Sequence, residues 1–153
     1  KLTIFIHKYN LGEMNLSYSV DTTTRVRYSE TDKMGYVYYG NYPTYFEMGR
    51  VECLRTLGLS YKEMEDNGVM LPVKDLNVQY KSPAKYDDLL TIRTKITELS
   101  GSRIFFTYSI LNTEGKLLTV GETTLVFVSA ENMRPIRPSQ TIIDTLKPYE
   151  VHA

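Results

Sequence analysis

The chain has 153 residues, and its 18 basic and 18 acidic side chains give a formal net charge of zero. This length suits one domain with a real core, whereas the balanced charge argues against a dedicated nucleic-acid-binding protein, which carries a basic excess. No apolar run approaches the roughly 20 residues that a membrane helix needs. We therefore expect no nucleic-acid partner and no membrane span.

Reactive side chains are scarce. Cys53 is the single cysteine, so an intrachain disulfide is impossible and a reducing, cytoplasmic location is favoured. The two histidines, His7 and His152, stand near the chain ends, which disfavours Ser-His-Asp and Cys-His arrangements and zinc sites. Any chemistry must then run on carboxylates, hydroxyls, backbone amides and water.

The beginning of the chain is interpreted as an N-terminal extension, residues 1–16, ahead of a single domain at residues 17–153. Its apolar run Leu2–Ile6 is too short for a signal-peptide core. Two interpretations stay open. Met14 could be the natural start, with the preceding residues an upstream extension, or the segment could form an additional strand or arm.

The domain opens with an alternating segment, residues 23–29, that predicts a half-buried strand. A loop follows at residues 30–40. The apolar pattern then predicts a long helix over residues 42–57, with Asn41 as its N-cap and Gly58 as its stop. This helix is apolar on several sides, so we expect it to be covered on more than one of them.

The rest of the chain is predicted to be mainly strands. Residues 60–67 predict a second short helix, with Ser60 as its cap. Strands are expected at residues 75–81, 90–97, 104–110 and 117–129, and a short terminal helix at residues 139–146. Tight connections between the strands suit antiparallel pairing. The order predicts an α+β fold, an antiparallel sheet curled around one long helix.

The most informative feature is Asp32, a carboxylate in a glycine-containing loop just before the helix that opens near Asn41. A carboxylate can attack a carbonyl carbon or activate water. The unpaired amides and the dipole at a helix start can stabilise an oxyanion. Aspartate is also common in turns, so the spacing alone leaves a purely structural role open.

The sequence resembles the hotdog-fold 4-hydroxybenzoyl-CoA thioesterase family, in the branch that includes the Tol-Pal-associated acyl-CoA thioesterases. The resemblance runs from about Thr23 to Pro138. Its most specific runs are Arg27–Gly35, Asn41-Tyr42, Phe46–Arg50, Leu71–Val73 and Tyr80–Asp88. It implies hydrolysis of acyl-CoA thioesters without metal or other cofactor. It also implies a homodimer or homotetramer with active sites at the dimer interface.

The resemblance also implies roles for individual residues. Asp32 matches the catalytic carboxylate, acting as nucleophile or general base, and the backbone amides of Tyr39 and Gly40 match the oxyanion hole. The substrate-binding residues that it implies are Tyr28, Asn41, Lys81, Ser82, Arg103 and Arg134. Many members of this branch carry histidine where this chain has Tyr39. The backbone role of Tyr39 therefore carries over better than any side-chain role.

Alternatives remain open on the sequence. Glu47, on the predicted helix, is a rival catalytic carboxylate, although an ion pair with Arg50 is favoured for it. The substrate could be an acyl-carrier-protein thioester instead of acyl-CoA. A non-catalytic acyl-CoA-binding protein is a third possibility, motivated by Tyr39. A hydratase is disfavoured, because hotdog hydratases generally use an internal histidine.

Overall fold

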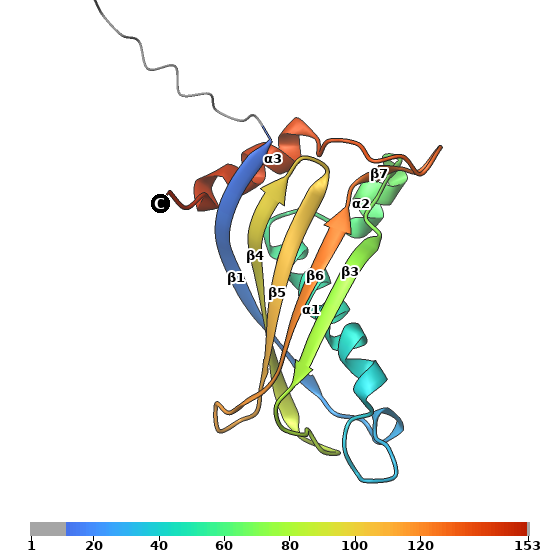
Figure 1. Ribbon diagram of the computed structural model, residues 1–153, viewed down its shortest axis with the longest axis vertical. Coiled ribbons are helices and arrows are strands. Elements are labelled where there is room, and N and C mark those ends of the chain that lie inside the picture. The colour runs from blue at the N-terminus through green and yellow to red at the C-terminus, as the bar shows by residue number, and fades with distance from the viewer. Residues whose placement is uncertain (1–11, 153) are drawn as a thin grey trace, which may run out of the picture.

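A computed structural model describes residues 12–152. Five antiparallel strands form one sheet in the order β1-β4-β5-β6-β3, and the long helix α1 lies along one face of it (Figure 1). The bounds are β1 Glu13–Arg25, α1 Tyr42–Thr56, β3 Val73–Tyr80, β4 Leu89–Ser100, β5 Arg103–Leu111 and β6 Leu117–Val126. The predicted α+β architecture, an antiparallel sheet around one long helix, is confirmed.

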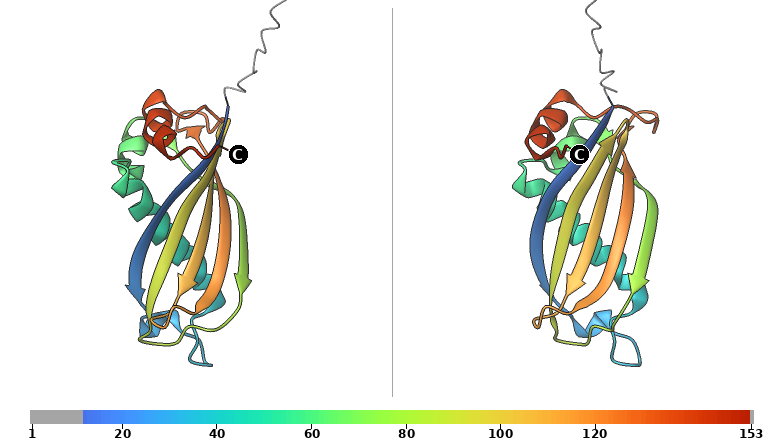
Figure 2. Two further views of the ribbon diagram at one scale, coloured as in Figure 1. Left: turned by 90° about the vertical axis from the view of Figure 1, so that its left-hand side faces the viewer. Right: turned by 60° about the vertical axis from the view of Figure 1, so that its left-hand side comes forward.

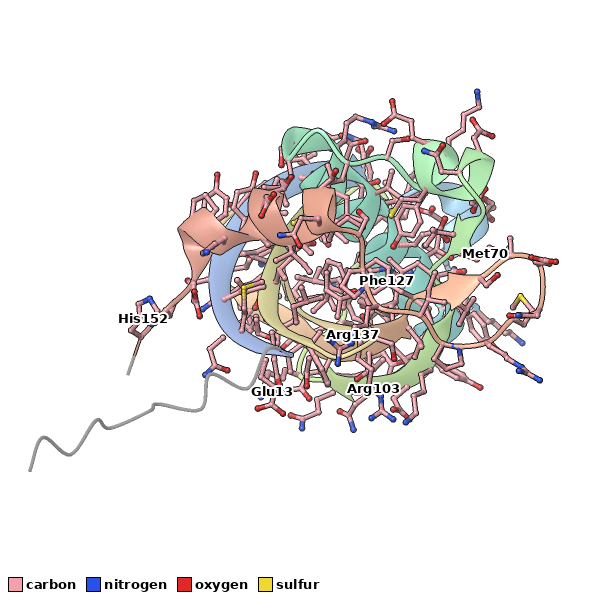
Figure 3. All side chains as sticks on the ribbon, turned by 90° about the horizontal axis from the view of Figure 1, so that it is seen from above. Glu13, Met70, Arg103, Phe127, Arg137 and His152 are labelled. Carbon is pink, nitrogen blue, oxygen red and sulfur yellow. The ribbon has the colours of Figure 1, made fainter. Side chains whose placement is uncertain are left out.

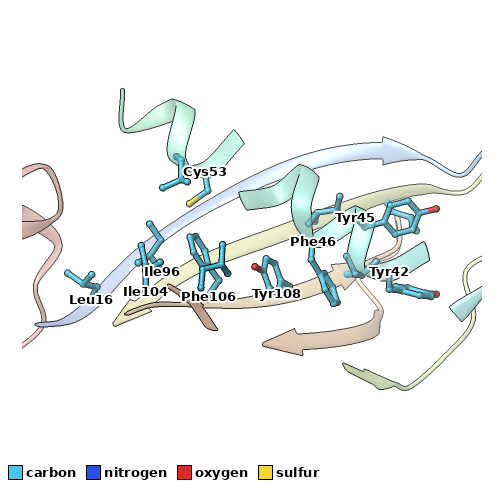
Figure 4. Close-up of a cluster of buried hydrophobic side chains, with 14 of the residues drawn as sticks. Leu16, Tyr42, Tyr45, Phe46, Cys53, Ile96, Ile104, Phe106 and Tyr108 are labelled. Atoms are coloured by element: carbon cyan, nitrogen blue, oxygen red, sulfur yellow. The ribbon is translucent and has the colours of Figure 1, made fainter. Parts of the chain in front are cut away.

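The core fills the space between α1 and the sheet (Figure 4). Aromatic side chains dominate its centre: the rings of Phe46 and Tyr108 stack at 4.4 Å between centroids. Gly49 lets the helix approach β4 closely, because a Cβ atom there would collide with the side chains of Thr94 and Ile92. The face of α1 that carries Phe46 and Gly49 thus packs on the sheet.

Short elements complete the fold. Ser60 caps α2, Tyr61–Asp66, and accepts a hydrogen bond from the N–H of Glu63, as predicted. The terminal helix is also confirmed. The other short elements are α3 Gln140–Leu146, the 3-10 helices η1 Tyr28–Glu30, η2 Tyr39–Asn41 and η3 Lys147–Tyr149, and a two-stranded sheet of β2 Val69–Met70 and β7 Val128–Ser129. This small sheet was not predicted.

Two strand boundaries differ from the prediction. The first strand, β1, begins at Glu13, which pairs with Ser100, so it starts ten residues earlier than the predicted strand. Its far end is Arg25, because residues 28–30 turn into η1. The predicted strand over residues 117–129 is interrupted at Phe127, whose N–H donates to the carbonyl of Ser102. Residues 1–11, including His7, lie outside the described residues.

The sheet has two ends, and they differ in character. At one end Arg25 pairs with Leu89, and the loop over residues 26–41 leads into α1 (Figure 1). At the other end Glu13 pairs with Ser100, and α3 lies nearby (Figure 2). At about 3.3 Å per residue, strand β4 separates these ends by roughly 35 Å. Residues at opposite ends of the sheet are therefore too far apart to form one site within a single chain.

Candidate active site

The loop that carries Asp32 is fastened to the segment between β3 and β4. The N–H of Val26 donates to the carbonyl of Asp88 at 2.9 Å, and the N–H of Val37 donates to the carbonyl of Ala84 at 2.8 Å. Val37 and Ala84 are both buried. Two segments distant in sequence thereby form one end of the molecule, at the start of α1.

The carboxylate of Asp32 is oriented by its own loop. Its Oδ1 atom accepts hydrogen bonds from the N–H of Met34 at 2.9 Å and of Tyr36 at 3.3 Å, while its own N–H donates to the carbonyl of Tyr36 at 2.7 Å. Gly35 permits this tight turn with a φ of 77°. Within residues 12–152 no donor binds Oδ2. The turn therefore fixes one oxygen and leaves the other available.

Asp32 borders a cavity of about 300 Å³. The cavity is lined mainly by aromatic and apolar side chains, together with those of Lys81 and Ser82. Its lining is Asp32, Met34, Tyr36, Val37, Tyr39, Tyr42, Tyr80, Lys81, Ser82 and Pro83. Four of the expected site residues, Asp32, Tyr39, Lys81 and Ser82, thus share one cavity.

The start of α1 presents free amides beside this cavity. The carbonyl of Tyr38 accepts the N–H of Asn41 at 2.9 Å, but among residues 12–152 nothing accepts the N–H of Tyr39 or of Gly40. Tyr39 lines the cavity and Gly40 does not. Of the two amides, that of Tyr39 is therefore the better placed relative to Asp32.

Asn41 stands at the N-cap position, but the prediction that it caps the helix by its side chain is wrong. Its backbone is helical, with φ −85° and ψ −16°, and its side chain forms no capping hydrogen bond. The amide Nδ2 instead donates to the carbonyl of Glu30 at 2.8 Å. Asn41 thereby ties the start of α1 to the loop and does not border the Asp32 cavity.

Three other expected substrate-binding residues lie away from Asp32 in the same chain. Tyr28 is 80% exposed and packs edge-on against Tyr86, outside the cavity. Arg103 begins β5 at the opposite end of the sheet, which Figure 3 shows from above with Arg103 labelled. Arg134 follows β7, which pairs with β2 ahead of β3.

The rival carboxylate, Glu47, borders a different cavity of about 370 Å³, together with Arg50 and Tyr61. The expected Glu47–Arg50 ion pair is absent from the described part of the chain. The Arg50 guanidinium is buried and donates instead to the hydroxyls of Tyr61 at 3.3 Å and Tyr108 at 3.1 Å. Helical spacing alone could not show that these two phenols would take the guanidinium away from Glu47.

Two residues of the site were missed by the sequence analysis. Glu30 fastens the loop, because its backbone carbonyl accepts the N–H of Tyr38 and its carboxylate accepts the N–H of Arg27. Tyr80 reaches across from β3, and its hydroxyl donates to the carbonyl of Tyr39 at 2.9 Å. The three-residue spacing of Arg27 and Glu30 was a local signal that could have indicated Glu30. Tyr80 had no such signal, because its partner Tyr39 lies 41 residues away in the sequence.

The structure offers little support for a cysteine nucleophile or a metal site. Cys53 is buried, and burial raises the pKa of its thiol to about 12, so it is not a thiolate nucleophile. Within residues 12–152, no group of three or more His, Cys, Asp or Glu side chains could hold a metal ion. Over the same range, no helix has the length and apolarity needed to cross a membrane.

Comparison with known proteins is consistent with this geometry. Residues 34–119, more than half of the chain, match the thioesterase superfamily model. The acyl-CoA thioester hydrolase YbgC of Escherichia coli O157:H7 is 35% identical over 80% of this chain and 92% of its own length. The acyl-CoA thioesterase YbgC of Haemophilus influenzae is 33% identical over 73% of this chain and 82% of its own.

A solved structure has the same fold as this chain. The DHNA-CoA thioesterase from Staphylococcus aureus superimposes with a TM-score of 0.80 at 38% identity, covering 86% of this chain and 88% of that one. The chain therefore belongs to the thioesterase superfamily, as a thioester hydrolase with the hotdog fold.

Proposed function

We propose that the protein hydrolyses acyl-CoA thioesters, with Asp32 as the catalytic carboxylate and the N–H of Tyr39 as an oxyanion-hole donor. The observation that supports this proposal is the shared cavity. One Asp32 oxygen is held by two backbone amides, the other has no donor within residues 12–152, and Tyr39 borders the same space with a free N–H. One such donor is worth roughly 3 kcal/mol in a transition state.

Two routes use these groups. In the first, Asp32 attacks the thioester carbonyl carbon, the C–S bond breaks, and CoA leaves as a thiolate that takes a proton. Water then hydrolyses the mixed anhydride and regenerates the carboxylate. In the second, Asp32 takes a proton from water, whose oxygen attacks the same carbon. The C–S bond then breaks, and the CoA thiolate leaves and takes a proton back from Asp32. In both, negative charge develops on the carbonyl oxygen, where the amide of Tyr39 acts.

We propose acyl-CoA as the substrate because the similar proteins are named as acyl-CoA thioesterases. Lys81 lines the Asp32 cavity and offers a cation to the phosphates of CoA. Hydrolysis of an acyl-carrier-protein thioester would use the same carboxylate. The two substrate classes differ in what lies beyond the pantetheine arm, so a direct comparison of turnover separates them.

We also propose a homodimer through the edge strand β3. The outer edge of β3 has no partner strand among residues 12–152. Val73, Leu76 and Tyr80 leave about half of their surface exposed, at 48%, 45% and 51%. An unprotected apolar edge invites pairing with a second copy. Antiparallel pairing places the Val73 end of one β3 beside the Tyr80 end of the other.

This dimer would bring together residues that are separate in one chain. The cavity with Glu47 and Arg50 also includes Leu71 and Pro72, directly before β3, whereas the Asp32 cavity includes Lys81 and Ser82, directly after it. Two-fold pairing of β3 therefore places the Glu47 cavity of one copy near the Asp32 cavity of its partner. In such a dimer, Glu47 of one copy could contribute to the active site of its partner, while Asp32 remains the catalytic carboxylate.

The test is an acyl-CoA substrate panel assayed with the wild type, Asp32→Asn and, as a matched control, Asp66→Asn. Asp66 is an exposed carboxylate at the end of α2, outside both cavities. We expect Asp32→Asn to lower kcat by about a hundredfold or more and Asp66→Asn to leave it unchanged. Equal turnover by Asp32→Asn and the wild type would show that Asp32 is not the catalytic carboxylate. Faster turnover of the carrier-protein thioester would overturn the choice of substrate.

A further inference from the structure

The hydroxyl of Tyr80 joins the sheet to the start of α1. Tyr80 is the last residue of β3, and its hydroxyl donates to the backbone carbonyl of Tyr39 at 2.9 Å, across 41 residues of sequence. Both residues border the cavity that contains Asp32. A side chain of the edge strand therefore holds the backbone of the residue that lies beside the catalytic carboxylate.

Tyr39 is held at both of its peptide groups. On its N-terminal side, the carbonyl of Tyr38 accepts the N–H of Asn41 at 2.9 Å. On its C-terminal side, its own carbonyl accepts the hydroxyl of Tyr80. A trans peptide is planar, so its N–H points opposite to its carbonyl. Holding these two carbonyls thus sets the directions of the N–H groups of Tyr39 and Gly40.

The ring of Tyr80 is itself positioned by packing. It lies edge-on to Tyr42, at 5.3 Å between centroids and 72°, and Tyr42 is buried. It also lies edge-on to the ring of Tyr39, at 6.5 Å and 85°. Such aromatic contacts have a preferred geometry. Desolvation, followed by the neighbouring Tyr42 and Tyr39, raises the pKa of Tyr80, so its hydroxyl stays protonated and able to donate at neutral pH.

We infer that Tyr80 is a positioning residue for thioester hydrolysis: its hydroxyl holds the Tyr39 backbone so that the free amides at the start of α1 keep their aim at the reacting carbonyl. This inference rests on the proposed function. Tyr80 acts through Tyr39 and does not touch the reacting atoms. A preorganised donor is effective because it needs no rearrangement when charge develops.

Two simpler roles for Tyr80 make different predictions. As a substrate contact, its hydroxyl would bind the ground state, so its loss would raise KM and leave kcat alone. As a packing residue, its ring alone would matter, and removal of the hydroxyl would change nothing. A positioning role predicts a lower kcat with KM nearly constant, because an interaction that matters in the transition state is weakened.

The experiment compares Tyr80→Phe with the wild type and with Tyr86→Phe. The first substitution keeps the ring that packs on Tyr42 and removes only the donor. Tyr86 is a matched control, because it is 56% exposed, packs on Tyr28 and does not line the cavity. We expect kcat of Tyr80→Phe to fall about tenfold, with KM within twofold, on a short and on a long acyl-CoA alike.

Amide hydrogen exchange by mass spectrometry gives a readout that does not depend on turnover. We expect the peptide covering residues 36–42 to exchange faster in Tyr80→Phe than in the wild type or in Tyr86→Phe. Unchanged exchange, or a raised KM at constant kcat, would overturn the positioning role. If the wild type hydrolyses no acyl-CoA, the proposed function fails, whereas a changed exchange rate would still establish that Tyr80 holds the loop.

Discussion

The hydroxyl of Tyr45 donates to the carboxylate of Glu30 at 3.0 Å, which ties the first turns of α1 to the loop that carries Asp32. Tyr45 is fully buried, and burial, followed by the neighbouring carboxylate, raises the pKa of its phenol well above the usual value. The phenol therefore stays a donor. The loop is held on one side by Tyr45 and on the other by the segment before β4.

Substitution of Tyr45 by Phe removes this donor and keeps the buried ring. We expect the free energy of unfolding to fall by about 1 kcal/mol, since one hydrogen bond to the Glu30 carboxylate is lost. Activity should fall too, because the Asp32 loop loses an anchor. Urea denaturation and steady-state kinetics measure the two effects. Tyr149→Phe is the control: Tyr149 is partly exposed, at 37%, and lies at the other end of the chain. Wild-type values for Tyr45→Phe in both measurements would contradict the anchoring role.

Gly49 sets how closely α1 approaches the sheet. A Cβ at this position would overlap the side chains of Thr94 and Ile92, both buried in β4. We expect Gly49→Ala to lower stability by about 1–3 kcal/mol through overpacking, despite the better helix propensity of alanine. Thermal unfolding checks this result. Thr44→Ala, on the exposed side of the same helix, should change stability by only a few tenths of a kcal/mol.

Cys53 tests whether a thiol takes part in the chemistry. Because the thiol is buried and its pKa is about 12, we expect iodoacetamide to leave the native enzyme fully active. Cys53→Ala should retain kcat while losing some stability, as a buried side chain becomes smaller. Titration of the thiol in the native and the denatured protein confirms its burial. Inactivation by the reagent at neutral pH would show that the thiol is accessible.

The pair of Asp21 and Arg93 links β1 to β4 through two hydrogen bonds of 2.9 Å. The hydrogen bond from Arg93 lowers the pKa of Asp21 below 3.8. A depressed carboxyl pKa stabilises the folded state above the unfolded value, and this stabilisation is lost as the pH falls through the folded pKa. Both side chains are about half exposed, so solvent screening keeps the contribution small.

Asp21→Asn should therefore lower the unfolding temperature at pH 7, and the difference from the wild type should shrink as the pH falls below 4. Calorimetry at several pH values measures this trend. Added salt at pH 7 should reduce the difference as well, because exposed charges are screened. A difference that persists unchanged at pH 2 would assign the effect to packing and not to charge.

Local patterns were sufficient for the helices and for most strands. Ser60 and Ser139 cap α2 and α3 because the capping bond is formed within three residues. The strand β1 was harder: its residues Glu13–Thr22 were not predicted as a strand, and they form one by pairing with β4. Such pairing is a tertiary property that a single sequence does not display.

In the site, too, local features could be predicted from the sequence and tertiary contacts could not. Asp32 and its amide-rich loop could be found in the sequence, because the turn is local: its acceptor and donors lie within four residues. Asn41 was expected to cap α1 and instead reaches back 11 residues to Glu30. The hydrogen bond from Tyr80 could not be predicted, because its partner Tyr39 is brought near only when β3 takes its place in the sheet.

The edge of β3 is the surface through which we expect two copies to pair. Leu76 stands in the middle of this strand with 45% of its surface exposed, on the side of the sheet that faces α1, and opposite the buried Thr123. If a second copy pairs here, a charge at this position is costly, because the dimer would bury it without a partner. We expect the wild type to be at least dimeric at micromolar concentration and Leu76→Lys to be mainly monomeric.

Sedimentation velocity measures both states, with Leu117→Lys as the control. Leu117 is similarly exposed, at 37%, but begins β6, an interior strand. Activity should fall together with the dimer, because the Glu47 cavity of one copy would no longer complete the Asp32 site of its partner. A monomeric wild type would refute pairing through β3, and a fully active monomeric Leu76→Lys would show that the Asp32 cavity suffices on its own.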